Sequence, residues 1–252
     1  MDIIDGILNV KDLNGETPFY KACFLGQLDI AKKLYDLCNN VIKHADNAAR
    51  TPFYIACFNG RTEIVKWLLG IDKSLMHIAN NNKCTPFLAA CFNGHLEIAQ
   101  MLYEIDPAII NIPNNLNVVP FFIACFNGHL NIVEWLIDLI DINTINALAY
   151  NNFKIATITC YAGHLDVLQF LYSKNPSCII DQLTKLKDMA YRDNRANILK
   201  WLNTINPSKP LKSNEITVPK FVDHSNCWAD IKEIFYNVTK YMDWTKEHSK
   251  QL

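Results

Sequence analysis

The sequence predicts an all-α protein in which about six helix pairs stack into a solenoid, followed by one further amphipathic helix. Two observations carry this prediction. One block of sequence returns every 34 residues, and each copy holds the start and stop signals of two short helices. In addition, half of the 252 residues are hydrophobic and 19% are charged, which is typical of a folded chain and not of a disordered one.

The repeat becomes visible when the chain is compared with itself. Four blocks read TPFYKACFLGQLDIAKKLY, TPFYIACFNGRTEIVKWLL, TPFLAACFNGHLEIAQMLY and VPFFIACFNGHLNIVEWLI. They begin at Thr17, Thr51, Thr85 and Val119. A fifth copy begins at Lys154 after a 35-residue step, and a shorter sixth ends in residues 190–202. A fixed period of about 20–50 residues indicates stacked supersecondary units.

Each copy predicts two short antiparallel helices. The first begins at a Thr-Pro pair in three copies, because threonine caps a helix N-terminus and proline suits the first turn. It ends at a residue that accepts the left-handed conformation, namely Gly26, Gly60, Gly94, Gly128, Gly163 or Asn194. The second helix carries apolar residues at helical spacing. Since no copy can bury both helices alone, we expect one continuous core from Leu28 to Leu202 and an elongated, curved rod.

The pattern T-P-x-x-x-A-C-x-x-G-H-L-x-I-V resembles the ankyrin repeat over about residues 11–205. Residues 12–18, DLNGETP, reproduce the family's D-x-x-G-x-T-P entry turn. The resemblance implies an ankyrin-type helical repeat solenoid, in which β-hairpin-like fingers join the helix pairs. It also implies a concave face, made of the finger tips and the first helices, that recognises proteins.

The chain departs from the family's pattern at two positions. The histidine of the family's T-P-L-H is replaced by Tyr20, Tyr54, Leu88 and Phe122. We therefore expect the polar network of that histidine to be absent, so that packing supplies more of the stability. The entry-turn glycine is replaced by Ala49, Lys83 and Asn117, of which only asparagine adopts positive φ easily. This replacement puts the finger geometry of copies two and three in question.

Aromatic residues occupy one position in the last turn of each first helix: Phe24, Phe58, Phe92, Phe126 and Tyr161. In the ankyrin family this position is commonly polar and lies on the recognition face. Either these rings are rigid apolar anchors for a partner, or they stack on one another as a structural spine. The neighbouring Asn59, Asn93 and Asn127 either supply hydrogen bonds around the strip or are plain turn residues. The predicted partner site consists of these eight residues.

No catalytic, cofactor or metal site is predicted. The cysteines Cys23, Cys57, Cys91, Cys125 and Cys160 share one repeat position. Stacked helices lie about 8–10 Å apart, too far for disulfides, so we expect reduced, buried thiols. His95, His129 and His164 follow the terminating glycines, where we expect structural hydrogen bonds. His224 and Cys227 could form half of a zinc site, but no second ligand pair is in view.

Charge and hydropathy exclude several kinds of partner. With 24 basic and 25 acidic residues the chain has no overall attraction for nucleic acid, and we expect none to bind. No segment approaches the roughly 20 apolar residues of a membrane helix, so we expect no membrane partner. The first residues, MDIID, lack the features of a secretory signal. We expect the protein in the cytoplasm, with the nucleus as an alternative.

The predicted function is a protein-interaction scaffold or adaptor that binds its partner through the concave face. Two alternatives stay open, a regulatory subunit or inhibitor of an enzyme and a permanent structural component of a larger assembly. We expect no enzyme, cofactor or small-molecule substrate, because the sequence offers no paired carboxylates, nucleophile–base set or phosphate loop in a plausible pocket.

The predicted domains are an N-terminal capping segment (1–10), the solenoid (11–205), a linker (206–222) and a C-terminal amphipathic helix (223–252). The apolar stripe of this helix is Trp228, Ile231, Ile234, Phe235, Val238, Tyr241 and Met242. The helix either docks on the solenoid as an extra cap or engages a groove of a partner.

Overall fold

The computed structural model describes residue 6, residues 8–140 and residues 154–205. The chain divides into two units, residues 1–205 and 206–252, and every described residue belongs to the first. The predicted linker, the predicted C-terminal helix and most of the predicted N-terminal cap therefore lie outside the described residues. Within these residues the regular structure consists of helices, which confirms the predicted all-α repeat architecture.

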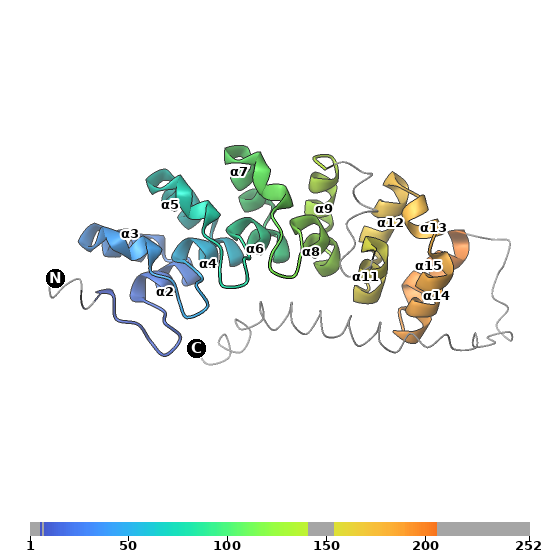
Figure 1. Cartoon of the computed structure of the whole chain (residues 1–252), viewed down its shortest axis with the longest axis horizontal. Helices are drawn as coiled ribbons and strands as arrows, with labels where there is room; N and C mark the ends of the chain where they lie inside the picture. The colour runs from blue at the N-terminus through green and yellow to red at the C-terminus, as the bar shows by residue number, and fades with distance from the viewer. Residues whose placement is uncertain (1–5, 7, 141–153, 206–252) are drawn as a thin grey trace. The chain divides into compact units, whose positions relative to one another are not determined.

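The helices form two layers. The first helices of the copies are α2 (Pro18–Leu25), α4 (Pro52–Phe58), α6 (Pro86–Phe92), α8 (Pro120–Asn127), α11 (Ile155–Ala162) and α14 (Leu183–Arg192). The second helices are α3 (Leu28–Leu37), α5 (Thr62–Ile71), α7 (Leu96–Ile105), α9 (Leu130–Ile137), α12 (Leu165–Lys174) and α15 (Ala196–Ile205). In Figure 1, α3, α5, α7 and α9 lie in a row above α2, α4, α6 and α8. Each first helix contacts the first helices of the neighbouring copies.

The ends of the first helices are as predicted. The hydroxyl oxygens of Thr17, Thr51 and Thr85 accept the N–H of the residue three positions later at 3.1–3.2 Å. Val119 has no such oxygen, and α8 begins without a side-chain cap. At the other end the predicted glycines all have positive φ, and Asn194 does so at 54°. Local capping therefore sets the length of about two turns.

Short helices that the sequence analysis did not predict follow the second helices. They are η1 (Asn39–Lys43), η2 (Lys73–His77), η3 (Pro107–Asn111) and α13 (Ser177–Ile180). The carboxylates of Asp72 and Asp106 cap η2 and η3 by accepting backbone N–H groups of Ser74 and Ala108. These turns add apolar residues, such as Leu75 and Ile109, to the core between the layers.

The fingers of the first four copies share one clasp, in which a side-chain oxygen accepts two backbone N–H groups at 2.8–3.0 Å. The accepting residues are Asp12, Asp46, Asn80 and Asn114. Successive fingers are also linked to one another, because the Nδ2 groups of Asn47, Asn81 and Asn115 donate to a carbonyl of the preceding finger. The finger asparagines thus stabilise the stack as well as the turns.

The finger geometry is retained where the family's glycine is missing. Ala49, Lys83 and Asn117 have φ values of 59°, 56° and 56°, so all three adopt the left-handed conformation. The clasp hydrogen bonds hold Ala49 and Lys83 in a conformation that such residues otherwise avoid.

Relieving this strain should stabilise the protein. We expect Ala49→Gly and Lys83→Gly each to raise the free energy of unfolding by about 0.5–1 kcal/mol, which is the left-handed penalty minus the larger chain entropy of glycine. Urea unfolding measures the change. Asn117→Gly is the matched control and should have a much smaller effect, because asparagine tolerates positive φ. A loss of stability in the first two variants would show that their backbone is not strained.

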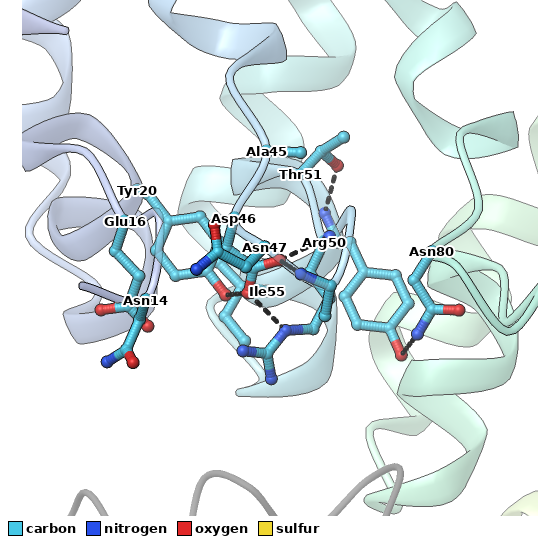
Figure 2. Close-up of polar contacts among 12 residues, drawn as sticks. Asn14, Glu16, Tyr20, Ala45, Asp46, Asn47, Arg50, Thr51, Ile55 and Asn80 are labelled. Carbon is cyan, nitrogen blue, oxygen red and sulfur yellow. Dashed lines mark hydrogen bonds and ion pairs between the residues drawn. The ribbon is translucent and has the colours of Figure 1, made fainter. Parts of the chain in front are cut away.

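The family's histidine network is absent, but in the first copies a different polar network takes its place, where packing alone was expected. The hydroxyl of Tyr20 donates to Oδ2 of Asp46 at 3.0 Å, and Nε of Arg50 donates to the same oxygen at 2.6 Å. Figure 2 shows these three side chains pointing toward one another. In the next junction Nδ2 of Asn80 donates to the hydroxyl oxygen of Tyr54 at 3.4 Å. A tyrosine ring is long enough to place its hydroxyl at the following finger, so it substitutes for an imidazole.

Burial strengthens this cluster. Asp46 and Arg50 are 6% and 7% exposed, and burial raises the pKa of the Tyr20 hydroxyl, so that it remains a donor at neutral pH. In copies three and four the tyrosine position is held by Leu88 and Phe122, which are buried and apolar. There, packing supplies the stability, as the sequence predicts.

Candidate protein-interaction face

The predicted partner residues lie at the ends of the first helices, from α2 to α11. Phe24, Phe92, Phe126 and Tyr161 are half-buried, whereas Phe58 is only 7% exposed. The rings of Phe58 and Phe92 stack, with centroids 6.0 Å apart and planes at 19°. Spine-like stacking therefore occurs at this pair, and the remaining rings keep part of their surface accessible.

A second apolar row lies on the same face of the first helices. It consists of Ile55, Ala89, Ile123 and Ile158. Each precedes an aromatic residue by three positions, so the two side chains share one side of the helix. These four residues are buried, with at most 3% exposed. The sequence signal for this row was the apolar residue after T-P-F-Y, T-P-F-L and V-P-F-F, which the prediction did not use.

The first helices of four copies carry no formal charge. Helices α4, α6, α8 and α11 contain no acidic or basic residue. In the first copy Lys21 takes the place of the apolar row, and its Nζ lies 2.6 Å from a carboxylate oxygen of Asp12. The face that carries the aromatic row, from α2 to α11, is called the first-helix face below.

The three predicted asparagines donate hydrogen bonds within the protein. Nδ2 of Asn59 donates to the carbonyl of Ile55 at 2.9 Å in the same helix. Nδ2 of Asn93 and Nδ2 of Asn127 instead donate to the carbonyls of Phe58 and Phe92 in the preceding copy, at 2.7 and 3.1 Å. Their amide nitrogens therefore serve the junctions between copies.

The residues that follow the terminating glycines close the same junctions. Nε2 of His95 lies 3.0 Å from the carbonyl oxygen of Phe58, and Nε2 of His129 lies 2.8 Å from that of Phe92. Since a carbonyl only accepts, each Nε2 must carry the hydrogen. Arg61 and Arg195 make the corresponding bonds to Phe24 and Tyr161. The expected structural hydrogen bonding of the histidines is confirmed here.

Comparison with known protein families decides the classification. A family model described as ankyrin repeats in three copies matches residues 2–77 and 73–146, which together exceed half of the chain. The chain belongs to the ankyrin repeat family. No curated protein matches it. Ankyrin repeats are generally protein–protein interaction modules and are typically non-catalytic.

The five first-helix cysteines of this ankyrin solenoid are free and buried, as predicted. Burial raises the pKa of each first-helix cysteine, to about 12 for Cys160, and it also raises the pKa of the equivalent residues in the earlier copies. A thiolate therefore does not form at neutral pH. Among the described residues no group of three or more His, Cys, Asp or Glu side chains could hold a metal ion. No described helix has the length and apolar character needed to span a bilayer.

The junction histidines make the stability of the ankyrin solenoid depend on pH. Burial lowers the pKa of His95 and of His164 in the folded state. The unfolded chain, with histidine pKa values near 6.5, then binds protons that the folded chain does not bind. We expect stability to be fully present above about pH 6.5 and to fall as the pH decreases below it.

Unfolding midpoints at about pH 7.5 and about pH 5.5 measure this effect. The variant His95→Gln/His164→Gln keeps a side-chain N–H donor but cannot titrate in this range. It should lose part of the pH dependence of the natural chain. If the dependence persisted in full, other groups would be responsible for it.

Proposed function

We propose that this ankyrin repeat protein is a non-catalytic scaffold or adaptor that binds a protein partner through the first-helix face. The observation that supports the proposal most strongly is the row of partly accessible aromatic rings on successive first helices that bear no charge. Aromatic side chains supply large contact area at low entropic cost and are enriched at interface hot spots. An uncharged strip favours a protein partner over nucleic acid, whose phosphates require cations.

The reduced thiols bear on where the protein acts. Among the described residues the five first-helix cysteines (Cys23, Cys57, Cys91, Cys125 and Cys160) are buried free thiols, and free thiols persist in reducing compartments. We therefore propose that the protein acts in the cytoplasm, with the nucleus as the alternative.

Affinity capture from native lysate, followed by mass spectrometry, tests the proposed face. The variant Phe92→Ser/Phe126→Ser removes two half-buried rings and leaves Phe58 intact, because losing a ring that is 7% exposed would cost about 3 kcal/mol of stability. We expect its capture of the partner to fall roughly tenfold or more, as hot-spot truncation does.

The control variant Leu37→Ser/Ile180→Ser removes two side chains that are 60% and 50% exposed and lie off this face. It should capture the same partner as the natural chain, and melting temperatures should show that both variants are folded. The proposal fails if the control variant loses the partner and the face variant retains it.

A further inference from the structure

Two groups of three aromatic side chains repeat one geometry between the layers. Trp67 of α5 lies 5.7 Å from Tyr35 of α3, ring to ring, with the planes at 90°. It also lies 6.3 Å from Phe19 of α2, at 51°. Trp135 of α9 lies 5.6 Å from Tyr103 of α7 at 87°, and 6.4 Å from Phe87 of α6 at 58°. The second group therefore reproduces the first.

The two aromatic groups lie two repeat copies apart in the sequence. The corresponding members are 68 residues apart (87−19, 103−35 and 135−67), which is twice the 34-residue period. The last two copies contain a third edge-to-face pair, Tyr172 of α12 with Trp201 of α15, at 5.8 Å and 86°. Each pair joins an odd copy to the even copy that follows.

The junctions between these pairs have different chemistry. At the tyrosine position, copies two and four carry Leu69 and Ile137. At the tryptophan position, copies three and five carry Met101 and Phe170. An edge-to-face pair of aromatic rings therefore cannot form at these positions between copies two and three or between copies four and five.

The other contacts between copies two and three do not compensate for the missing ring pair. Nζ of Lys66 lies 2.9 Å from Oε1 of Glu97, but these side chains are 46% and 65% exposed, and such surface pairs contribute little. The Phe58–Phe92 stack crosses the same junction on the first-helix side. On the second-helix side Nε2 of His77 also lies 3.8 Å from Oδ2 of Asp106, but these side chains are 48% and 34% exposed, and Leu69 and Met101 occupy the positions where the neighbouring junctions have a ring pair.

We infer that the solenoid is built from two-copy units, which are copies one and two, three and four, and five and six. In a repeat protein, stability is a sum of the contributions of single copies and of their junctions, so alternating junctions divide the stack. An edge-to-face pair should make the opening of a junction roughly 2- to 12-fold less favourable than an aliphatic contact of similar area. The stack therefore opens between α5 and α7 before it opens between α7 and α9.

Hydrogen exchange of the full chain in sub-denaturing urea tests this inference. We expect the amides of α6, α7, α8 and α9 to share one opening event, separated from the event of α4 and α5. Loss of copies one at a time, a boundary between α7 and α9, or a single global event for the whole solenoid would overturn the inference.

Variants show whether the rings cause the pairing. Trp135→Leu should split the shared event and raise the opening constant of α9 relative to α7 roughly 2- to 12-fold. Met101→Leu, at the equivalent position of copy three, is the matched control and should leave the boundaries unchanged. An unchanged pattern in Trp135→Leu would also overturn the inference. If that variant does not fold, the exchange pattern of the natural chain decides.

Discussion

Asp46→Asn should lower the free energy of unfolding by about 3 kcal/mol, because it removes the anionic partner of a buried guanidinium. Oδ2 of Asp46 accepts from both Arg50 and Tyr20, and Asp46 and Arg50 are less than a tenth exposed. The asparagine oxygen can still accept the two backbone N–H groups of the finger, so the loss reports the charge and the acceptor Oδ2, and not the turn. Urea unfolding followed by circular dichroism measures it.

The chain supplies its own control for this experiment. At the positions of Asp46 and Arg50, copy four has Asn114 and Val118, with the finger clasp intact at 2.9 and 3.0 Å. The double variant Asp46→Asn/Arg50→Val has the same two residues as copy four. Its free energy of unfolding should lie within about 1 kcal/mol of that of the natural chain, because replacing a whole buried ion pair is often neutral. A double variant as unstable as the single one would contradict the ion-pair explanation.

Gly94→Ala should lower the free energy of unfolding by about 2–3 kcal/mol. Gly94 has φ +79°, and a Cβ atom there would lie 2.7 Å from Nδ1 of His129. The left-handed conformation costs an alanine about 1–2 kcal/mol, and displacing the imidazole sacrifices its hydrogen bond to the carbonyl of Phe92, worth about 1 kcal/mol. Thermal or urea unfolding detects a change of this size.

Gly70→Ala is the matched control for that substitution. Gly70 lies within α5, and no heavy atom comes within 4 Å of a Cβ built there. The same change of side chain should therefore stabilise the protein by about 0.5–1 kcal/mol, as expected for alanine in a helix interior. If both variants shifted stability in the same direction, the close approach of glycine and imidazole would not explain the first result.

Local signals made the helix pattern predictable. Thr17, Thr51 and Thr85 cap helices through bonds to their own third neighbour, and the terminating glycines act within one turn, so adjacent residues contain the information. The short helices η2 and η3 carried similar signals, Asp72 before Lys73-Ser74 and Asp106 before Pro107, which could have predicted them.

Contacts between copies were harder to predict. The bond from Tyr20 to Asp46 spans 26 residues, and the bond from His95 to the carbonyl of Phe58 spans 37. Any residue type can supply a backbone carbonyl acceptor, so the sequence does not identify it. A tyrosine hydroxyl has no preferred sequence spacing to its partner. The left-handed conformation of Ala49 likewise depends on a clasp that outweighs local preference.

The sequence predicts which residues occupy equivalent positions on the first-helix face, but not how exposed each side chain is. Period alone placed Phe58 and Phe92 at equivalent positions, yet one is buried and the other half-buried. Phe58 lies between the rings of Tyr54 and Phe92, whereas copy three has Leu88 in place of that tyrosine. Exposure depends on such neighbours, which vary from copy to copy.

Site-specific photocrosslinking tests the central claim, that a protein partner binds the first-helix face, most directly. A benzophenone-bearing phenylalanine analogue would be placed at Phe126 in one protein and at Leu37, on the second helix of copy one, in another. The proposal predicts irradiation-dependent adducts with one protein partner from position 126 and none from position 37. Adducts from position 37 alone would contradict it.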